Sequence, residues 1–385
     1  MHKARMLTPG PTPLPEEVRL TAARELIHHR KEEFKHIFAR VRAGLKYLFG
    51  TKEEVLILTS SGTGAMVAAV ENIFSPGEKV LVVEGGKFGQ RFREIALNWG
   101  LEVVSLPVKW GRAVEISQIE EKFKEHPEIK GILVQASETS TGVLHPVQEI
   151  ASFCQKKGIL CVVDGISAVG ISPCPMDEWG IDCLLTGSQK GLMLPPGLAF
   201  VALSGRAWEK VKSNCKRPFY FDLIKEKKKV VQNQTAYTPA ISLILSLEVS
   251  LKYFTEKGLK EIYLKQRALT EMVRAGVELI GLELLVKEHY TWGLTSVLLP
   301  KAVSASKVLK YMKDNFGYTL AGGQDQLKDR IIRIGHMGYV DYVDLLGVLF
   351  ALKESYVACG GFSGARNYLE ESLKVYFKTL SAGGC

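Results

Sequence analysis

The chain has 385 residues, 46% hydrophobic and 24% charged, and this ordinary globular composition predicts two or three domains and excludes disorder, collagen or coiled coil for the whole chain. The net charge of +9 is spread along the sequence without a nucleic-acid-binding motif, so we expect no nucleic acid partner. The sequence lacks a run of about 18 apolar residues and a hydrophobic signal core near its start, so we expect a cytoplasmic protein with no membrane span.

The cysteines do not have the spacing of a metal site. They contain no Cys-x-x-Cys pair and are followed by no closely spaced histidine pair, which argues against a zinc centre. Their odd number, seven, is typical of reduced thiols in a reducing compartment. We therefore expect no bound metal.

The N-terminal segment is rich in residues that disfavour helices. Between positions 9 and 15 it contains Pro9, Gly10, Pro11, Pro13 and Pro15. Because proline fixes φ and lacks an N–H donor, residues 1–15 are predicted to form an extended arm. Apolar residues then recur at helical spacing, which predicts one helical stretch from Glu16 to Leu48.

Strands and helices are predicted to alternate over the next 150 residues. Apolar runs predict strands at 55–58, 79–83, 101–106, 131–135, 159–163, 183–186 and 198–202. Helices are predicted between them at 65–73, 88–99, 116–123 and 146–157. This order is typical of right-handed βαβ crossovers, so the fold class is α/β, with a mainly parallel sheet sandwiched by helices.

The pattern changes after Tyr237. Helices are predicted at 243–254, 259–279, 304–313, 340–356 and 366–380, with strands at 292–299 and 330–334. These elements indicate a second, smaller α/β domain. The predicted division is an arm over 1–15, a large domain over 16–255 and a small domain over 256–385.

Polar residues follow several predicted strands, at the sheet edge where open α/β folds build their sites. The segment Ser60–Gly64 joins a strand to a helix, and it fits either an anion-binding helix N-terminus or a simple tight turn. The hydroxyl-rich segment Ser137–Gly142 fits either a binding loop or a polar turn.

Two ionisable residues have similar positions. Asp164 directly follows an apolar strand, where a buried carboxylate needs a partner such as a cationic ring nitrogen, although it could instead cap the next helix. Lys190 lies among small and apolar residues, where burial would lower the pKa of its amine and make it nucleophilic. A lysine extending from a turn into solvent is the alternative.

The order of these features resembles a known family. Ser188-Gln189-Lys190 is followed by Pro195-Pro196-Gly197, and the similarity runs from Leu7-Thr8-Pro9-Gly10-Pro11-Thr12 to Arg333-Ile334-Gly335. The chain resembles the class V (fold type I) aminotransferases that use pyridoxal 5'-phosphate. Within them it is most similar to alanine–glyoxylate and serine–pyruvate aminotransferases and to relatives labelled soluble hydrogenase small subunit.

The resemblance implies a role for each matching residue. Lys190 would bind the cofactor covalently and carry the proton at the substrate Cα, and Asp164 would keep the pyridine nitrogen protonated. Phe88 would stack on the ring, and Thr139 would contact its phenolic side. The implied cofactor-binding set is Ser61, Gly62, Thr63, Phe88, Thr139, Asp164, Gln189, Lys190 and Thr238.

The resemblance also implies substrate and subunit contacts. Arg333 would hold the substrate α-carboxylate through paired hydrogen bonds, with Gly10 beside the substrate. A homodimer with shared active sites is implied, in which Gln234, Tyr237 or Thr238 extends to the neighbouring phosphate site. His29-Arg30 resembles a substrate-side pair and equally fits a solvated helix face.

The predicted reaction moves an amino group from alanine or serine to glyoxylate or pyruvate. A phosphoserine aminotransferase-like activity, suggested by His29-Arg30, and a non-catalytic hydrogenase-associated subunit are the alternatives. Cysteine desulfurases fit less well, because they need a cysteine before the substrate arginine and a histidine on the ring. Here Cys359 follows Arg333, and Phe88 takes the histidine position.

Overall fold

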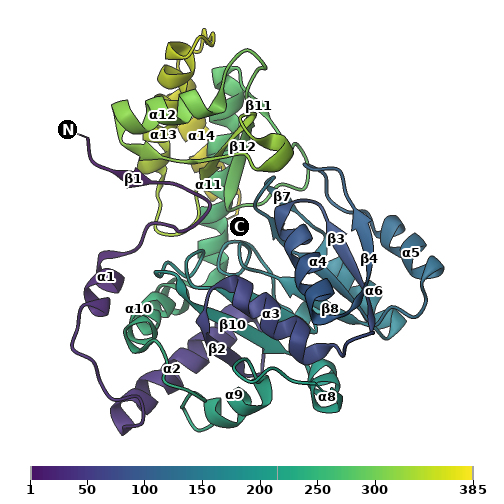
Figure 1. Ribbon diagram of the computed structural model, residues 1–385. Helices are drawn as coiled ribbons and strands as arrows, with labels where there is room; N and C mark the ends of the chain where they lie inside the picture. The colour runs from purple at the N-terminus through teal and green to yellow at the C-terminus, as the bar shows by residue number, and fades with distance from the viewer. Residues whose placement is uncertain (1, 215, 384–385) are drawn as a thin grey trace.

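A computed structural model describes residues 2–214 and 216–383. Figure 1 shows a large α/β body below and a smaller body above, joined by the long helix α11 (Leu259–Ile280). Each body has its own hydrophobic core, one built from residues between Val18 and Phe254 and the other mainly from residues between Ala268 and Tyr376. The domain boundary at 255 remains our proposal.

The large body contains a seven-stranded sheet. In spatial order its strands are β2 (Val55–Ser60), β10 (Gly197–Leu203), β9 (Cys183–Gly187), β8 (Leu160–Asp164), β5 (Gly131–Gln135), β3 (Lys79–Glu84) and β4 (Glu102–Pro107). Only β10 pairs antiparallel, with β2 and β9, among the described strands of this sheet. This arrangement confirms the predicted mainly parallel sheet.

Burial explains why these strands appear in the sequence as continuous apolar runs. Every residue of β5, β8 and β9 is buried, so both faces of the sheet are covered. The helices of this body are α2 (Glu32–Phe49), α3 (Gly62–Ile73), α4 (Lys87–Trp99), α5 (Ile116–Glu125), α6 (Val147–Lys157), α7 (Met176–Trp179), α8 (Gly205–Ser213), α9 (Leu223–Val230) and α10 (Ile241–Lys257). The short strands β6 (Ser137–Glu138) and β7 (Val143–Leu144) form a hairpin beyond β5.

The single helical stretch predicted from Glu16 to Leu48 is wrong. The structure has a short helix α1 (Glu16–Ala22), a non-helical segment, and then α2. Leu26, which the predicted apolar face included, is 66% exposed and lies outside both helices, whereas Val18 of α1 and Phe34 of α2 are buried. The apolar spacing therefore corresponds to a buried face within each helix and not across the segment between them.

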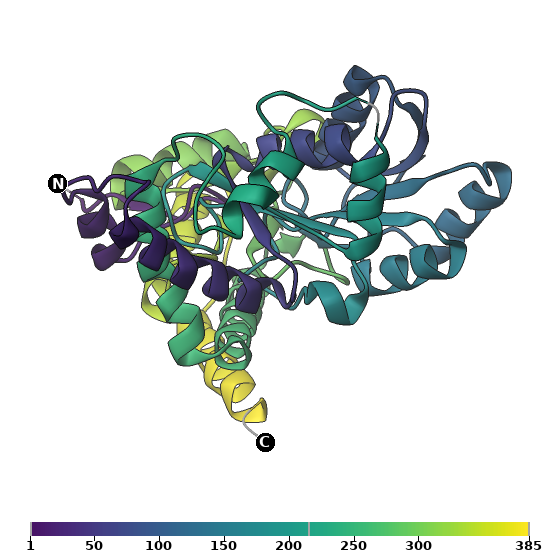
Figure 2. The same cartoon turned by 90° about the horizontal axis from the view of Figure 1, so that it is seen from below.

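The smaller body has a four-stranded sheet covered by helices. Its spatial order is β11 (Glu283–Leu284), β12 (Leu294–Leu298), β15 (Ile331–Gly335) and β14 (Ala321–Gly322). Its other elements are α12 (Ala305–Phe316), the short strand β13 (Tyr318–Thr319), the 3₁₀ turn η1 (Asp325–Leu327), α13 (Tyr342–Ala358) and α14 (Tyr368–Ala382). Figure 2 shows α14 extending away from the large sheet.

The N-terminal arm joins this smaller body. Strand β1 (Arg5–Met6) pairs in parallel with β13, and Leu7 belongs to the smaller hydrophobic core. The arm then passes to α1 beside α10 of the large body (Figure 1). Residues 7–15 therefore cross between the two bodies, which places Pro9 and Gly10 near the ends of the central strands.

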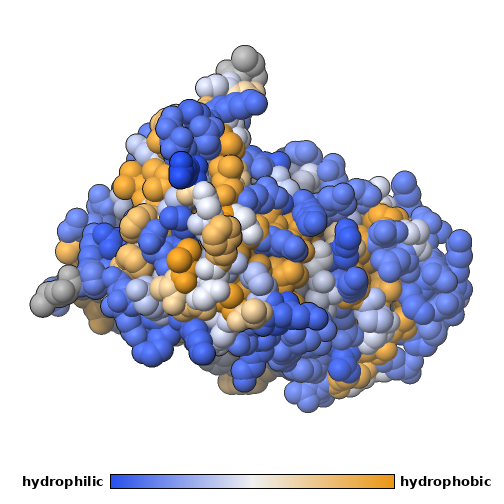
Figure 3. Space-filling view, turned by 90° about the horizontal axis from the view of Figure 1, so that it is seen from above, coloured by the Kyte–Doolittle hydropathy of each residue, from blue (hydrophilic) through white to orange (hydrophobic). Residues whose placement is uncertain are grey.

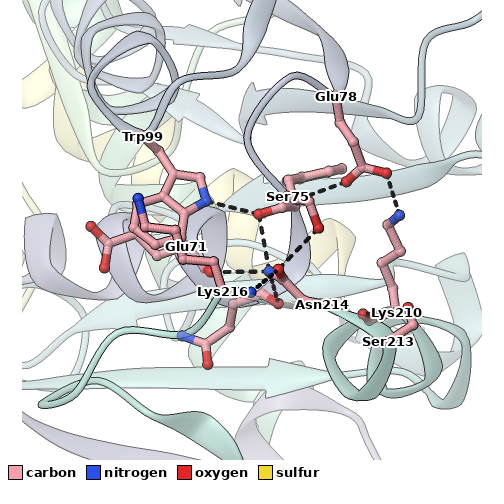
Figure 4. Close-up of polar contacts among 10 residues, drawn as sticks. Glu71, Ser75, Glu78, Trp99, Lys210, Ser213, Asn214 and Lys216 are labelled. Atoms are coloured by element: carbon pink, nitrogen blue, oxygen red, sulfur yellow. Dashed lines mark hydrogen bonds and ion pairs between the residues drawn. The ribbon is translucent and has the colours of Figure 1, made fainter.

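A buried asparagine holds the far end of α3. The Asn214 amide donates to the backbone carbonyls of Asn72 and Phe74, both at 3.0 Å, and accepts from Ser75 Oγ at 2.9 Å. Figure 4 shows Asn214 beside Ser75. Nearby, Lys210 pairs with Glu78. These bonds satisfy carbonyl groups that the helix end leaves without partners, and they fix the C-terminal end of α3. The opposite end of α3 faces the candidate site.

The surface is mixed. Figure 3 shows a face dominated by hydrophilic side chains and broken by smaller apolar patches. Across residues 2–214 and 216–383, none of the helices combines the length and apolar character needed to cross a membrane.

Candidate functional site

The carboxyl ends of β2, β5, β8 and β9 surround a cavity of about 100 Å³. Parallel strands that end at one edge bring together residues that are far apart in sequence. The lining residues are Ser61, Gly62, Thr63, Phe88, Arg91, Ser137, Thr139, Asp164, Ile166, Ser167, Gln189 and Lys190. Eight of the predicted site residues therefore lie around one space, together with Ser137 of the candidate hydroxyl-rich segment. Arg91, Ile166 and Ser167, which also line it, were not assigned a role from the sequence.

Lys190 lies at the wall formed by the N-terminal arm. Its Nζ donates a hydrogen bond to the carbonyl of Pro9, and its own carbonyl accepts one from Thr12 Oγ1 at 3.0 Å. Burial lowers the pKa of the Lys190 amine to about 8, because the charged form loses solvation. A larger fraction of this amine is therefore neutral and nucleophilic near neutral pH than for a solvated lysine.

Gly10 is required where the arm passes this lysine. Its φ of +124° is a backbone conformation that favours glycine, and a Cβ at this position would lie 2.5 Å from Lys190 Nζ. The structure thus places the predicted substrate-side Gly10 in direct contact with the lysine side chain. A substitution here would displace the amine.

Asp164 ends β8 with a buried carboxylate. Within the described chain its one hydrogen bond is from the Ile166 N–H, at 2.8 Å. Burial raises the pKa of Asp164 to about 7, and the charge of Glu138 adds to this rise. In the sheet register Asp164 lies opposite Gln135, whose buried amide has no hydrogen-bond partner among the described residues. The carboxylate would be stabilised by a cation on its cavity side.

The first turn of α3 lies at the cavity, at the end of the helix opposite the one that Asn214 holds. Ser61 precedes the helix without capping it through its side chain, and the Gly64 N–H donates to the Ser61 carbonyl at 2.8 Å. Within the described residues, the N–H groups of Gly62 and Thr63 remain available to an anion. Gln189 Oε1 is buried at the same cavity without a partner in the described part of the chain. Arg91 Nη1 donates to Thr63 Oγ1 at 3.2 Å, which adds a positive charge beside this turn.

Phe88 and Ile166 supply apolar walls to the cavity. The guanidinium carbon of Arg91 lies 4.9 Å from the Phe88 ring centroid. Arg91 follows Phe88 by one helical turn, a spacing that places both side chains on one face of α4. That spacing was the signal in the sequence that could have identified Arg91.

Arg333 lies outside the set of residues that line the cavity. It is buried in β15, where Nε donates to the Gly322 carbonyl at 2.9 Å and Nη1 to the Thr139 carbonyl at 2.7 Å. The second bond joins the smaller body to a loop of the cavity. The positive charge of Arg333 contributes to the lowered pKa of the Lys190 amine at the cavity.

The predicted subunit-contact residues lie elsewhere. Tyr237 and Thr238 line a separate small hollow with Glu226 and Phe221, away from the cavity of their own chain. Arg30 donates to Gln234 Oε1 at 3.0 Å and to the Thr235 carbonyl at 2.9 Å. In this chain Arg30 therefore fixes the 234–235 segment, and it does not line the cavity around Lys190.

The residues present fit pyridoxal 5'-phosphate. The cavity offers an amine with a lowered pKa, a buried carboxylate that forms no ion pair within the described part of the chain, a helix N-terminus for a phosphate and apolar walls for a flat ring. The orphaned Gln189 oxygen is a further polar atom that a bound group could satisfy.

Comparison with known proteins agrees with this chemistry. A model of the family described as aminotransferase class-V matches residues 16–330. The soluble hydrogenase small subunit of Synechococcus sp. (strain PCC 6716) is 38% identical over 354 residues, covering 91% of this chain and 92% of that protein. The serine–glyoxylate aminotransferase of Methylorubrum extorquens is 31% identical, covering 95% of this chain and 96% of that protein.

A solved structure shows the same architecture. The ureidoglycine–glyoxylate aminotransferase of Bacillus subtilis superposes with a TM-score of 0.93 at 25% identity, over 98% of this chain and 99% of that one. The chain therefore belongs to the class V aminotransferase family, and it is a pyridoxal-phosphate-dependent aminotransferase with the fold type I architecture.

Proposed function

We propose that this aminotransferase moves an amino group from a small amino acid, alanine or serine, to a small 2-oxo acid, glyoxylate or pyruvate. The observation that carries the proposal is the meeting of the Lys190 amine, the Asp164 carboxylate and the α3 N-terminus around one cavity. Two similar proteins with glyoxylate in their names support the acceptor. Their donors, serine and ureidoglycine, differ, so the donor is the less constrained choice.

Lys190 and Asp164 would perform the central chemistry. Bound pyridoxal phosphate supplies an electron sink that stabilises the negative charge left when a proton leaves the substrate Cα. Lys190 would hold the cofactor covalently at rest and then move that proton as general base and acid. Asp164 would face the ring nitrogen and keep it protonated, and this cation would lower the pKa of Asp164 from its raised value.

The remaining cavity residues would orient the cofactor. Ser61, Gly62, Thr63 and Gln189 would bind its phosphate, and Thr139 would contact the phenolic side. Phe88 would cover one face of the ring. The positive charge of Arg91 beside Thr63 supports an anion at this end of the cavity.

Arg333 would bind the substrate α-carboxylate. Two carbonyl groups orient its guanidinium, and a lysine could not keep both bonds while presenting paired donors. Arg333→Lys should therefore weaken transition-state binding by about 2–4 kcal/mol. This loss would lower kcat/KM for every amino acid and oxo acid roughly 30- to 1,000-fold. Steady-state kinetics on several substrates would measure this, with the exposed Arg112→Lys as control. A loss of cofactor affinity with normal substrate binding would contradict the role.

Phe88→Ala should have the opposite pattern. Stacking beyond area burial contributes about 0.5–1.5 kcal/mol, so cofactor affinity should fall modestly while the preference among substrates stays the same. Titration of the apoenzyme by absorbance would measure the cofactor dissociation constant, with Phe362→Ala, 87% exposed, as control. Changed substrate choice at unchanged cofactor affinity would show that Phe88 lines the substrate region.

We further propose a homodimer in which Thr238 extends to the neighbouring phosphate site. Gln234 is held by Arg30, and the Tyr237 hydroxyl donates to the Phe219 carbonyl at 2.9 Å, whereas Thr238 is exposed and makes no side-chain hydrogen bond within the described residues. Phe219 is 76% exposed beside this segment, which supports a covering partner. Analytical ultracentrifugation should give twice the mass of one chain.

The cytoplasmic location also remains a proposal. Four cysteines, at 154, 161, 174 and 183, are free and buried in the described structure, which supports a reducing environment.

The alternative activities are not favoured. Arg30, the residue that suggested a phosphoserine aminotransferase, is occupied with the 234–235 segment. A non-catalytic subunit would not need Lys190, Asp164 and Arg333 to be retained in or beside one cavity. The glyoxylate aminotransferases among the similar proteins support a working enzyme.

A substrate panel tests the proposed function directly. The purified, cofactor-loaded chain would receive alanine, serine, aspartate, glycine or phosphoserine with glyoxylate, pyruvate or 2-oxoglutarate, and amino products would be quantified. We expect the highest kcat/KM for alanine or serine with glyoxylate or pyruvate. A clear preference for phosphoserine with 2-oxoglutarate, or no transfer with any pair, would overturn the proposal.

A further inference from the structure

We propose that Glu138 is a positioning residue that holds Phe88 and Thr139 in place at the cofactor cavity. Glu138 ends β6, is fully buried and does not itself line the cavity. The inference rests on the proposed function, because it concerns residues assigned there to the cofactor. It assigns a reason for a buried carboxylate that the proposed chemistry does not use directly.

One oxygen of Glu138 binds the start of α4. Oε2 accepts hydrogen bonds from the Phe88 N–H at 3.0 Å and the Gly89 N–H at 3.1 Å. The residue before the helix, Gly86, has no side chain to provide this cap, and a Cβ there would lie 2.6 Å from the Glu138 Cδ. Glu138 therefore supplies, from strand β6, the acceptor that the N-terminus of α4 needs, and it fixes the backbone of Phe88 itself.

The other oxygen shapes the loop that carries Thr139. Oε1 accepts from the Ser140 N–H at 3.1 Å and from the Ser140 hydroxyl at 2.6 Å. Ser140 Oγ in turn accepts from the Lys87 N–H at 3.0 Å. The carboxylate thus joins the first turn of α4 to the loop between β6 and β7.

The same loop extends the connection to the substrate side. The carbonyl of Thr139, the next residue after Glu138, accepts the hydrogen bond from Arg333 Nη1 at 2.7 Å. Two cavity residues and the proposed carboxylate-binding arginine therefore share one support. A buried carboxylate is costly unless it is fully hydrogen-bonded, and the four donors around Glu138 meet that condition.

Glu138→Gln tests the proposal with little change in volume. Both carboxylate oxygens accept backbone N–H bonds, so an amide NH₂ group must face a donor on one side, either at Phe88 and Gly89 or at Ser140. We expect the cofactor dissociation constant of the apoenzyme to rise about 10-fold. The circular dichroism of the bound cofactor should change, because this signal depends on the orientation of groups around the ring.

A double-mutant cycle separates positioning from general destabilisation. If Glu138 acts through Phe88, Glu138→Gln should weaken cofactor binding clearly less in a Phe88→Ala background than in the wild type. Glu149→Gln, an exposed change on α6, is the matched control and should leave binding unchanged. Ser140→Ala, which removes the hydroxyl bonds and keeps the carboxylate, gives a milder variant and should raise the dissociation constant by a smaller factor.

The outcomes are distinct. Wild-type cofactor affinity in Glu138→Gln, or an equal loss in both backgrounds, would overturn the inference and leave the proposed function standing. If Glu138→Gln fails to fold, Ser140→Ala decides through the same cycle with Phe88→Ala. Failure of the wild-type chain to bind pyridoxal phosphate would overturn the proposed function, and this inference with it.

Discussion

Lys190→Ala should lose transamination by about 10⁴-fold or more, because one side chain provides both the covalent attachment of the cofactor and the proton transfer. The fold should persist, since the substitution removes one hydrogen bond to the Pro9 carbonyl and shortens a side chain at a cavity wall. Lys190→Arg should be equally inactive, because a guanidinium does not deprotonate in proteins. Steady-state and single-turnover rates would measure both variants.

Covalent attachment gives a second measurement for this residue. Borohydride treatment of the loaded wild-type enzyme, followed by peptide mass spectrometry, should find the cofactor on the peptide that contains Lys190. The exposed Lys156→Ala on α6 is the control and should keep normal rates and labelling. Normal turnover by Lys190→Ala, or labelling at another lysine, would disprove the assignment.

Asp164→Asn should retain cofactor binding and lose about 10²–10³-fold in rate, because a neutral amide cannot keep the ring nitrogen protonated in a buried site.

The Asp164 carboxyl group also predicts a pH effect on the stability of the apoprotein. Its pKa is raised from 3.8 to about 7 on folding, so the folded state holds a proton that the unfolded state releases. Stability from this group is therefore present below about pH 4 and is lost as the pH rises towards 7.

Asp164→Asn should remove this pH-dependent loss of stability. Without cofactor, Asp164→Asn should unfold at a higher temperature than the wild type above pH 7, and the difference should shrink below pH 4. Bound cofactor should reduce the difference, because its ring nitrogen would pair with the ionised carboxylate. Thermal unfolding at several pH values would measure this. A rate within a few-fold of the wild type would show that Asp164 does not act on the ring nitrogen.

The sequence by itself predicted the α/β class, the mainly parallel sheet and the residues at its strand ends. Strands buried on both faces produce continuous apolar runs, and the polar residues that follow them must lie at one sheet edge. Asp164 and Lys190 follow apolar strands, where an ionisable side chain requires a partner or a task, but a helix cap and a solvent-exposed lysine remained alternatives. The order of the motifs, through the resemblance to the class V aminotransferases, assigned their roles.

Other features depend on contacts between distant segments. The break between α1 and α2 falls where the predicted apolar spacing continues through Leu26, whose side chain is 66% exposed in this chain. The contact between Gly10 and Lys190 arises because β1 pairs with β13 and directs the arm across the cavity. Neither the break between the helices nor the pairing of β1 with β13 has a signal in the residues that take part in it.

The supports of the site were also decided by tertiary structure. Arg91 follows Phe88 by one helical turn in the sequence, but its contact with Thr63 appears only in the folded chain. Glu138 was recognisable only once its two oxygens had donors from two elements. The sequence did not rank Gln234, Tyr237 and Thr238, and the proposed choice of Thr238 rests on the contacts that the structure gives to Gln234 and Tyr237. A sequence shows which side chains can donate or accept, but folding decides which distant groups they meet, because the pairing follows from the packing of whole strands and helices.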